Sequence, residues 1–492
     1  MKIKSLVVGM MACAALVACS NNDLVDDNNG NQPLEGEAYV AVAITNPNNT
    51  FGRATADDEE YGDDSENKVN DATFVFFDAS GNYITNVATT LTFNNNKQQS
   101  EAVLILKNAT IEPKSVVAFL NVPEGLHLNQ SLNALLKAAG TYGYSSNKAF
   151  TMSNSVFKKE GTAEMQIATS VDGYIQKSEA AAMEKPLPIY VERVLAKVTV
   201  KKDELQVEQT KVTLNGKQIT VKPEIKGWVL SGTNKNSYIL KNLAVNDITE
   251  SWVWGTNRSF WAKDVNYENF ANNQTEDLTF SPYIETQTTP QYCLENTLTW
   301  DAYKGTAVAY THLLVTAQIV GEDGTSVGTI CNYNGTYWKE EDLKSEFANG
   351  LKNFKKDENK AITSSDIKFV QAGDMGNKAY MAKATFKKGV NVAEGAVTAL
   401  AAKGQFMMYR DGKCYFWTPI EHFGNKEQTG AIGVVRNHVY ALNLTKIAGM
   451  GTPIVDPDQP IIPEKPSDDN SYLAAQVNIL PWKMVSQNVD LK

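Results

Sequence analysis

The chain has 492 residues, of which 42% are hydrophobic, and a formal net charge of −10. This length is enough for two or three domains, each with its own core. The acidic balance and the lack of a basic cluster exclude nucleic acid as an expected partner, because phosphate binding needs a concentrated basic surface.

The first residues indicate an export signal. Lys2 and Lys4 precede an apolar run over residues 6–18, which is too short to span a bilayer as a mature helix. The run closes with LVAC, an order that resembles a bacterial lipobox in which the Cys19 thiol is acylated. We predict a lipoprotein signal peptide over residues 1–19, and a membrane anchor through lipid. The alternative is an ordinary signal peptide with an incidental cysteine.

A strand is expected directly after the polar tether that follows the signal. EAYVAVAIT at residues 37–45 places Val40, Val42 and Ile44 on one face, as in a half-buried sheet position. The loop beyond it carries Arg53. If a protease cuts the Arg53–Ala54 bond, the strand loses its covalent link to the body and leaves a groove. We therefore predict that residues 20–53 are a propeptide with a tether and a removable first strand.

An acidic block, DDEEYGDD at residues 57–64, follows the predicted cut. It lacks the residue order of an EF-hand loop. A solvated loop that exposes the cut site is favoured over a cation site.

Most of the remaining chain alternates with period two between Gly, Asn and Asp breaks, which is typical of β-sandwich strands. KVNDATFVFFDASGNYI at residues 68–84, for example, predicts two strands and a hairpin. Short helices are predicted at residues 131–140, with Ser131 as N-cap and Gly140 as C′, at 178–185 and at 339–350. The predicted fold class is mostly β, with two consecutive β-sandwich domains of transthyretin-like or Greek-key type, short helical insertions and a C-terminal arm.

Two boundaries divide the chain. A proline-marked strand with a charged exit places one near residue 200, which gives domains over 54–200 and 201–449. Residues 449–470 hold five of the sixteen prolines. Proline-rich segments favour an extended backbone, so residues 452–470 are expected to reach roughly 60 Å and to project the residues beyond them away from the body.

The linker leads to a final amphipathic strand within residues 450–492. Leu473, Ala475, Val477 and Ile479 share one face, and Pro481 precedes a second extended piece that begins with Trp482. Such a strand must dock on a sheet of its own molecule or of a neighbour. Docking in the groove vacated by the first strand would be strand addition, with about 5–10 kcal/mol from apolar burial alone.

Four segments together resemble the Bacteroidales fimbrillins, the stalk subunits of type V pili: NPNNTFGRA at residues 46–54, PIYVERVLAKV at 188–198, RNHVYALNLTKIAGMGTP at 436–453 and the terminal VNILPWKMVSQNVDL. WVWGTNRSFWAKD and GWVLSGTNKNSYIL favour the minor, Mfa-type subunit over the major FimA type. The resemblance spans nearly the whole chain.

The resemblance implies a lipidated precursor that is carried to the outer membrane and cut by an arginine-specific surface protease. The subunit would then polymerise with identical subunits by donor-strand exchange, together with anchor and tip fimbrial subunits, and support adhesion and biofilm formation. By position, Cys19 matches the lipidated cysteine, Arg53–Ala54 the processing site, and residues 472–491 the donor strands.

Motifs for chemistry are weak, and we predict no enzyme, no cofactor and no metal site. GTSVG at residues 324–328 matches a nucleophile elbow only in letters, because it lies between two strand-like runs where a hairpin is expected. The histidines (His127, His312, His422, His438) never take a metal-binding spacing. Cys293, Cys331 and Cys414 are expected to be buried small hydrophobic residues.

A second function class remains open. Trp252, Trp254 and Trp261 would suit a sugar-stacking platform, although core aromatic residues are the favoured interpretation. A surface glycan-binding lipoprotein of an outer-membrane uptake system would use such a platform and keep its lipid.

Overall fold

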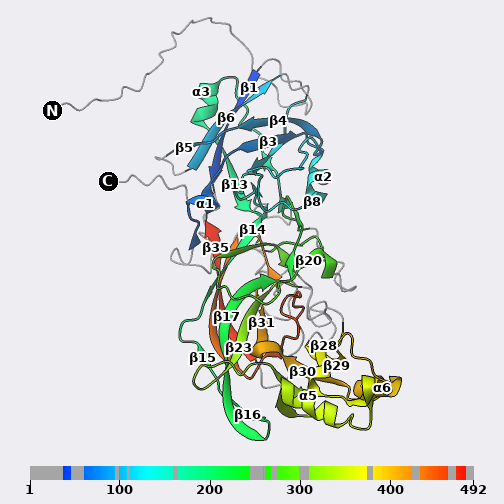
Figure 1. The fold of residues 1–492 in the computed structure, drawn as a ribbon. Helices are drawn as coiled ribbons and strands as arrows, with labels where there is room; N and C mark the ends of the chain where they lie inside the picture. The colour runs from blue at the N-terminus through cyan, green and yellow to red at the C-terminus, as the bar shows by residue number, and fades with distance from the viewer. Residues whose placement is uncertain are drawn as a thin grey trace, which may run out of the picture.

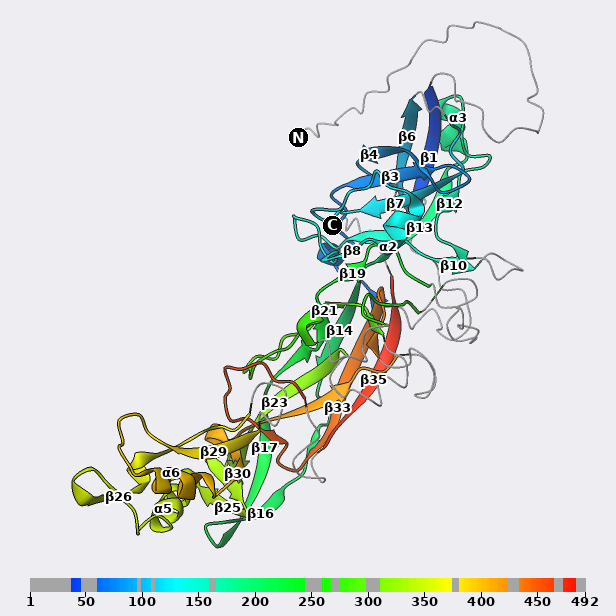
Figure 2. The same ribbon diagram turned by 90° about the vertical axis from the view of Figure 1, so that its right-hand side faces the viewer.

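The computed structural model is elongated, with the first sheet at one end and the second and third sheets packed together beyond it (Figures 1 and 2). The structure describes residues 37–45, 60–94, 99–107, 111–158, 165–243, 259, 261–267, 275–297, 310–373, 380–422, 433–463 and 472–483. The prediction of a mostly β chain is confirmed.

The first sheet encloses its own hydrophobic core. Its nine strands are β4 (Tyr83–Thr89), β3 (Ala72–Phe77), β7 (Ser115–Leu120), β9 (Met152–Asn154), β13 (Leu187–Arg193), β1 (Glu37–Thr45), β6 (Gln99–Lys107) and β5 (Thr92–Asn94) in spatial order, with β12 (Thr169–Ser170) beside β7. Inward side chains from β1, β3, β6, β7 and β13 meet in this core. The predicted β3–β4 hairpin is present, and its turn uses Gly81 at φ +77°, a backbone conformation that glycine adopts without steric cost.

The second sheet begins where the chain passes from β13 to β14. Its order is β2 (Glu60–Tyr61), β35 (Tyr472–Lys483), β33 (His438–Ala448), β14 (Leu195–Lys201) and β21 (Gln291–Leu294), with β15 (Gln206–Val207) beside β33. The crossing from the first sheet therefore lies at Val194, a few residues before the predicted boundary. Both the N-terminal and the C-terminal segments of the chain contribute strands to this sheet.

The third sheet packs against the second over a shared core. Its ten strands are β28 (Ile367–Gln371), β29 (Met381–Phe386), β30 (Gln405–Tyr409), β24 (Ile330–Tyr333), β25 (Thr336–Lys339), β16 (Thr210–Leu214), β17 (Lys217–Ser231), β23 (His312–Gly321), β31 (Lys413–Pro419) and β34 (Thr452–Pro453). With α5 (Glu340–Asn349) and α6 (Glu394–Ala401), strands β24 and β28–β30 form a third core. This lobe lies at the end of the molecule farthest from β1 (Figure 2).

The short helices are close to their predicted positions. Ser131 caps α2 (Leu132–Lys137) as predicted, whereas Gly140 is not its C′ residue, because it forms β8 (Ala139–Gly140) with β19 (Ser237–Tyr238). α3 (Glu179–Glu184) and α5 were predicted, and α1 (Asp64–Asn67) and α6 were not. No helix within the described residues has the length and hydropathy of a membrane span.

The remaining paired strands are two-residue ladders that close loops: β10 (Phe157–Lys158) with β11 (Met165–Gln166), β18 (Thr233–Asn234) with β20 (Leu278–Thr279), β22 (Asn296–Thr297) with β32 (Gly433–Val434), and β26 (Lys355–Lys356) with β27 (Lys360–Ala361).

Candidate strand-exchange site

Strand β1 is an inner strand of the first sheet, with a hydrogen-bonded neighbour on each side. It pairs antiparallel with β6 from Glu37↔Lys107 to Ile44↔Ser100. On its other side it pairs parallel with β13 from Val42↔Leu187 to Thr45↔Tyr190. If β1 leaves, two strands lose a ladder at once, so the vacant position has backbone groups on both sides that another strand can pair.

Both faces of β1 are buried. Val40, Val42 and Ile44 point into the first core and are at most 1% exposed. The opposite face was expected to be exposed, yet Ala41 and Ala43 are only 4% and 3% exposed. The half-buried prediction is therefore wrong, and the reason is α3, which contacts β1 and β6. Burying Val40, Val42 and Ile44 contributes roughly 5–9 kcal/mol.

Three predicted positions of the processing pathway lie outside the described residues. They are Cys19, Arg53 and Ala54. The structure does place the two ends of the loop that contains the predicted cut. One end is Thr45 of β1 in the first sheet and the other is Glu60 of β2 in the second.

The terminal strand β35 lies on the second sheet of its own molecule, beside β33 (Figure 2). The two strands pair antiparallel from Tyr472↔Ala448 to Pro481↔His438, with a bulge at Thr445. Leu473 and Ala475 pack against the core between the second and third sheets, as their predicted common face requires. Within the described residues, β2 pairs with the other edge of β35 only at Trp482 and Lys483. Most of β35 is therefore held by a single ladder.

The prediction that the proline-rich linker projects the terminal strand away from the body is wrong for this state of the molecule. Thr452 and Pro453 pair with β31, and Ile454, Val455 and Ile461 are buried. The prolines do not prevent this because apolar residues between them reach the third sheet. Residues 464–471 lie outside the described part.

The segment that follows the predicted cut is anchored at the junction of the first two sheets. Glu66, fully buried on α1, pairs with Lys197 of β14, with 3.0 Å between Oε1 and Nζ. The Arg193 Nε–H donates to the Glu66 carbonyl oxygen over 3.0 Å. Sequence reasoning missed these residues, although charges inside the apolar pattern of residues 188–198 are a signal of buried ion pairs.

The described part of the acidic block is ordered by its neighbours. Asp63 caps α1 and forms a capping box with Glu66, and Glu60 and Tyr61 form β2. Residues 60–64 therefore form a short strand and the capped start of a helix in place of the predicted loop, while Asp63 is exposed, as a solvated position would be. No group of residues that would suit a metal ion is found in the described chain.

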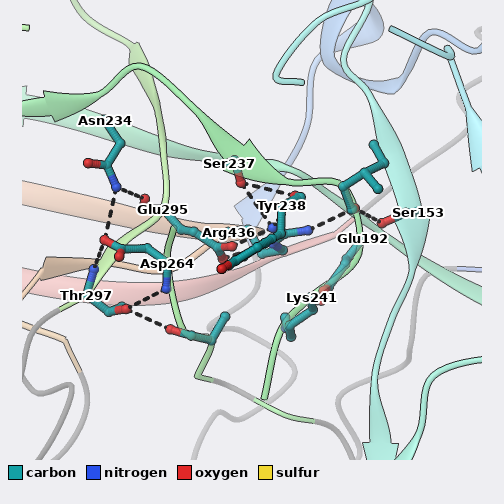
Figure 3. A network of polar contacts seen from close by, with 12 residues as sticks. Ser153, Glu192, Asn234, Ser237, Tyr238, Lys241, Asp264, Glu295, Thr297 and Arg436 are labelled. Carbon is teal, nitrogen blue, oxygen red and sulfur yellow. Dashed lines mark hydrogen bonds and ion pairs between the residues drawn. The ribbon is translucent and has the colours of Figure 1, made fainter. Parts of the chain in front are cut away.

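A second network of buried charges fixes the two sheets relative to each other (Figure 3). Lys241 Nζ lies 2.8 Å from Glu192 Oε2, and both side chains are fully buried. Arg436, which precedes β33, forms an equally buried pair with Glu295, which follows β21. Its guanidinium also donates to the Tyr238 carbonyl oxygen over 2.7 Å. The loop around β19 is thus held to both sheets.

We expect Arg436→Met to lower the free energy of unfolding by about 3–5 kcal/mol, because Glu295 is left as an unpaired buried charge. Adding Glu295→Met should restore much of the loss. The matched control is Lys201→Ala, which removes the pair with Asp203 whose side chains are 62% and 64% exposed, and it should cost less than about 1 kcal/mol. Urea unfolding of the four proteins measures these differences. Equal losses for the buried and the exposed pair would contradict the assignment.

Asp264 makes the stability of the same region depend on pH. Burial raises the pKa of Asp264 to about 7, against hydrogen bonds from Thr297, Asn234 and Asn266 that favour the carboxylate. The unfolded carboxyl titrates near pH ~4. Between these values the folded state binds more protons than the unfolded state, so stability falls as the pH rises.

We expect Asp264→Asn to remove a component of the order of 3 kcal/mol that is present below pH ~4 and lost by pH ~7. Urea unfolding at about pH 4.5, 6 and 7.5 measures it. Burial lowers the pKa of His312 to about 4, so the titration of this histidine makes stability rise with pH. This contribution is the same in the wild type and in Asp264→Asn. Parallel pH profiles for wild type and variant would contradict the prediction.

The motifs considered for chemistry have structural roles in the described residues. The chain reverses at residues 321–325, and the next element after GTSVG is β24, a strand and not the helix of a nucleophile elbow. Cys293, Cys331 and Cys414 are free and buried as predicted, and burial raises the pKa of Cys293 to about 12. Trp261 is fully buried against Tyr267 and cannot stack on a sugar. Trp252 and Trp254 lie outside the described residues.

The C-terminal part of the chain matches a known protein family. Residues 407–488, which include β33 and β35, match the family model described as "Major fimbrial subunit protein type IV, Fimbrillin, C-terminal". No curated protein matches the chain.

Two solved structures are similar over most of their length. A fimbrilin from Porphyromonas gingivalis is 15% identical, with 91% of this chain and 98% of that chain covered and a TM-score of 0.41. The tip fimbrial protein Mfa3 from the same organism is 10% identical, with 91% and 100% covered and a TM-score of 0.35.

Proposed function

The chain belongs to the Bacteroidales fimbrillin family, and on that premise we propose that it is a stalk subunit that polymerises by donor-strand exchange. The matched family model is that of a major fimbrial subunit, so we infer a structural subunit of a cell-surface fimbrium without enzymatic activity. The observation that carries the proposal is the contrast between β1, which has two ladders, and β35, which is held largely by one.

This contrast gives strand exchange a driving force. A β35 strand that leaves β33 of its own molecule gives up one ladder. In the position vacated by β1 on a neighbour it gains two, with β6 and β13, together with burial of both faces. Main-chain ladders supply affinity and alternate side chains supply fit, as in other cases of strand addition.

The proposed pathway starts from the lipidated precursor. Cys19 carries the lipid at the outer membrane, an arginine-specific protease cuts after Arg53, and β1 leaves with the propeptide. Residues 54–200 and 201–449 then form two β-sandwich domains, and residues 450–492 carry the donor strands. A tip subunit needs no donor strand, and an anchor keeps its lipid and first strand, so a chain with both a cut site and a donor strand suits the stalk. We favour the minor, Mfa-type subunit.

The N-terminal residue of surface-extracted protein tests the proposal. A stalk subunit should begin at Ala54, and negative-stain images of the extract should show filaments. A protein that still begins at a blocked Cys19 would overturn the proposal and favour the glycan-binding lipoprotein.

A further inference from the structure

Helix α3 covers the outer face of β1. Tyr39 and Gln176 exchange two backbone hydrogen bonds, of 2.8 and 2.9 Å. The chain then leaves the sheet, forms α3, and returns as β13 with Leu187 beside Val42. The outward-facing residue between these two points is Ala41.

The packing between α3 and β1 is tight. Ala182 of α3 is fully buried, and Ala41 is 4% exposed. Figure 1 shows α3 beside the strands β1 and β6. A larger side chain at the Ala41 position would have to displace the helix, because overfilling a close-packed contact is destabilising. A polar side chain there would also lose its hydrogen bonds to water.

A strand that replaces β1 must therefore fit beneath α3 on one face and fill the hydrophobic core on the other. On β35, Leu473 and Ala475 face the core of the second sheet, so period two places Ala474, Gln476 and Asn478 on the opposite face. Of these three residues only Ala474 is small. The side chains that face the core do not by themselves determine the register. If the incoming strand is shifted by two residues, Ala475 still fills one of the three positions of Val40, Val42 and Ile44.

We propose that α3 sets the register of strand exchange by admitting Ala474 of the incoming strand at the place of Ala41. The proposal rests on the strand exchange of the proposed function. The incoming strand keeps the direction of β1, because only that direction reproduces a parallel ladder with β13 and an antiparallel ladder with β6.

In this register Leu473, Ala475 and Val477 replace Val40, Val42 and Ile44. A shift by two residues would place Gln476 beneath α3 and Asn478 at Ala43, which buries two amides on the outer face. The proposed register buries one, Gln476 at Ala43. The opposite shift would force Tyr472 under the helix.

Cysteine pairs across the new ladder test the register. Ala41 lies opposite Val103 of β6, so Ala474 of the incoming strand should lie opposite Val103 of the receiving subunit. Directly opposed residues on antiparallel strands are close enough for a disulfide. The variants are Ala474→Cys with Val103→Cys, and Ala474→Cys with Ile105→Cys, each oxidised as processed polymers. Ile105 lies opposite Tyr39, the place that Ala474 would take if Gln476 lay beneath α3. The three native cysteines of the mature chain are buried and provide a common background.

We expect the 474/103 pair to give a covalent ladder on boiled, non-reduced gels, and the 474/105 pair to give at least about tenfold less. The uncut precursor with Ala41→Cys and Val103→Cys should form an internal disulfide, which shows that this position permits the bond. Preferential cross-linking of the 474/105 pair, or no cross-link from either pair in polymers that do form, would overturn the register. Failure of the wild-type protein to form any polymer after cleavage would instead overturn the proposed function.

Discussion

Arg53→Ala is expected to leave full-length lipoprotein on the cell and to abolish filaments. In the uncut chain β1 has a ladder on each side and three buried apolar side chains. The loop keeps the effective concentration of β1 at its groove high, so no strand from another molecule competes successfully. N-terminal sequencing of extracted protein and negative-stain imaging measure the two outcomes.

Two of the other four arginines are closed to a protease in the folded protein, which supports Arg53 as the predicted cleavage site. Arg193 is 1% exposed and Arg436 is fully buried, so neither is open to a protease in the folded protein. Lys68 is exposed and offers a control. A cut after Lys68 would detach α1 and its buried Glu66, so Lys68→Ala should be processed and polymerised like wild type. Filaments of Arg53→Ala that begin at Ala54 would show that the processing model is wrong.

The parts of the fold that sequence predicted well are those in which one short segment specifies its own structure. β3 and β4 each have an alternating sequence pattern, and the turn that joins them needs glycine at positive φ. Ser131 and Ser178 both accept a hydrogen bond from a backbone N–H in the first turn of their helices, as N-caps do. These interactions span only a few residues and are therefore readable from a single stretch of chain.

Long-range contacts account for the errors. The alanine face of β1 was assigned to solvent because alanine carries no strong signal, and the cover comes from α3, more than a hundred residues later. The proline-rich linker was expected to extend, but scattered apolar residues such as Ile454 and Ile461 are buried on the body. The ion pair between Glu66 and Lys197 joins two segments that have no local reason to meet.

The site itself was predictable as two similar strands, but not as a pair of unequal positions. The patterns of residues 37–45 and 472–483 indicate strands that fit comparable grooves. Sequence does not reveal that β1 is an inner strand and that β35 is largely an edge strand. That difference would make the proposed exchange favourable, because the incoming strand would gain a ladder.

Val477→Asp is expected to give a processed, folded monomer that cannot extend a filament. The backbone register places Val477 opposite Leu442 of its own molecule, and in the proposed exchange it takes the place of Ile44. An aspartate there requires burial of an unpaired carboxylate in an apolar groove, which is costly enough to prevent docking. Asn478→Asp is the matched control, because the neighbouring residue faces the other way and should polymerise nearly normally.

A gel of unboiled surface extract separates the two variants. An exchanged strand is released slowly, so wild-type polymers should survive SDS at room temperature as a ladder of multimers that collapses on boiling. Asn478→Asp should retain this ladder and Val477→Asp should lose it, while circular dichroism of the purified monomers shows that Val477→Asp loses at most the β content of β35. Equal ladders from Val477→Asp and wild type would overturn the donor-strand assignment. The contact of β35 with β33 would then be its permanent position, and the subunits would have to join through another surface.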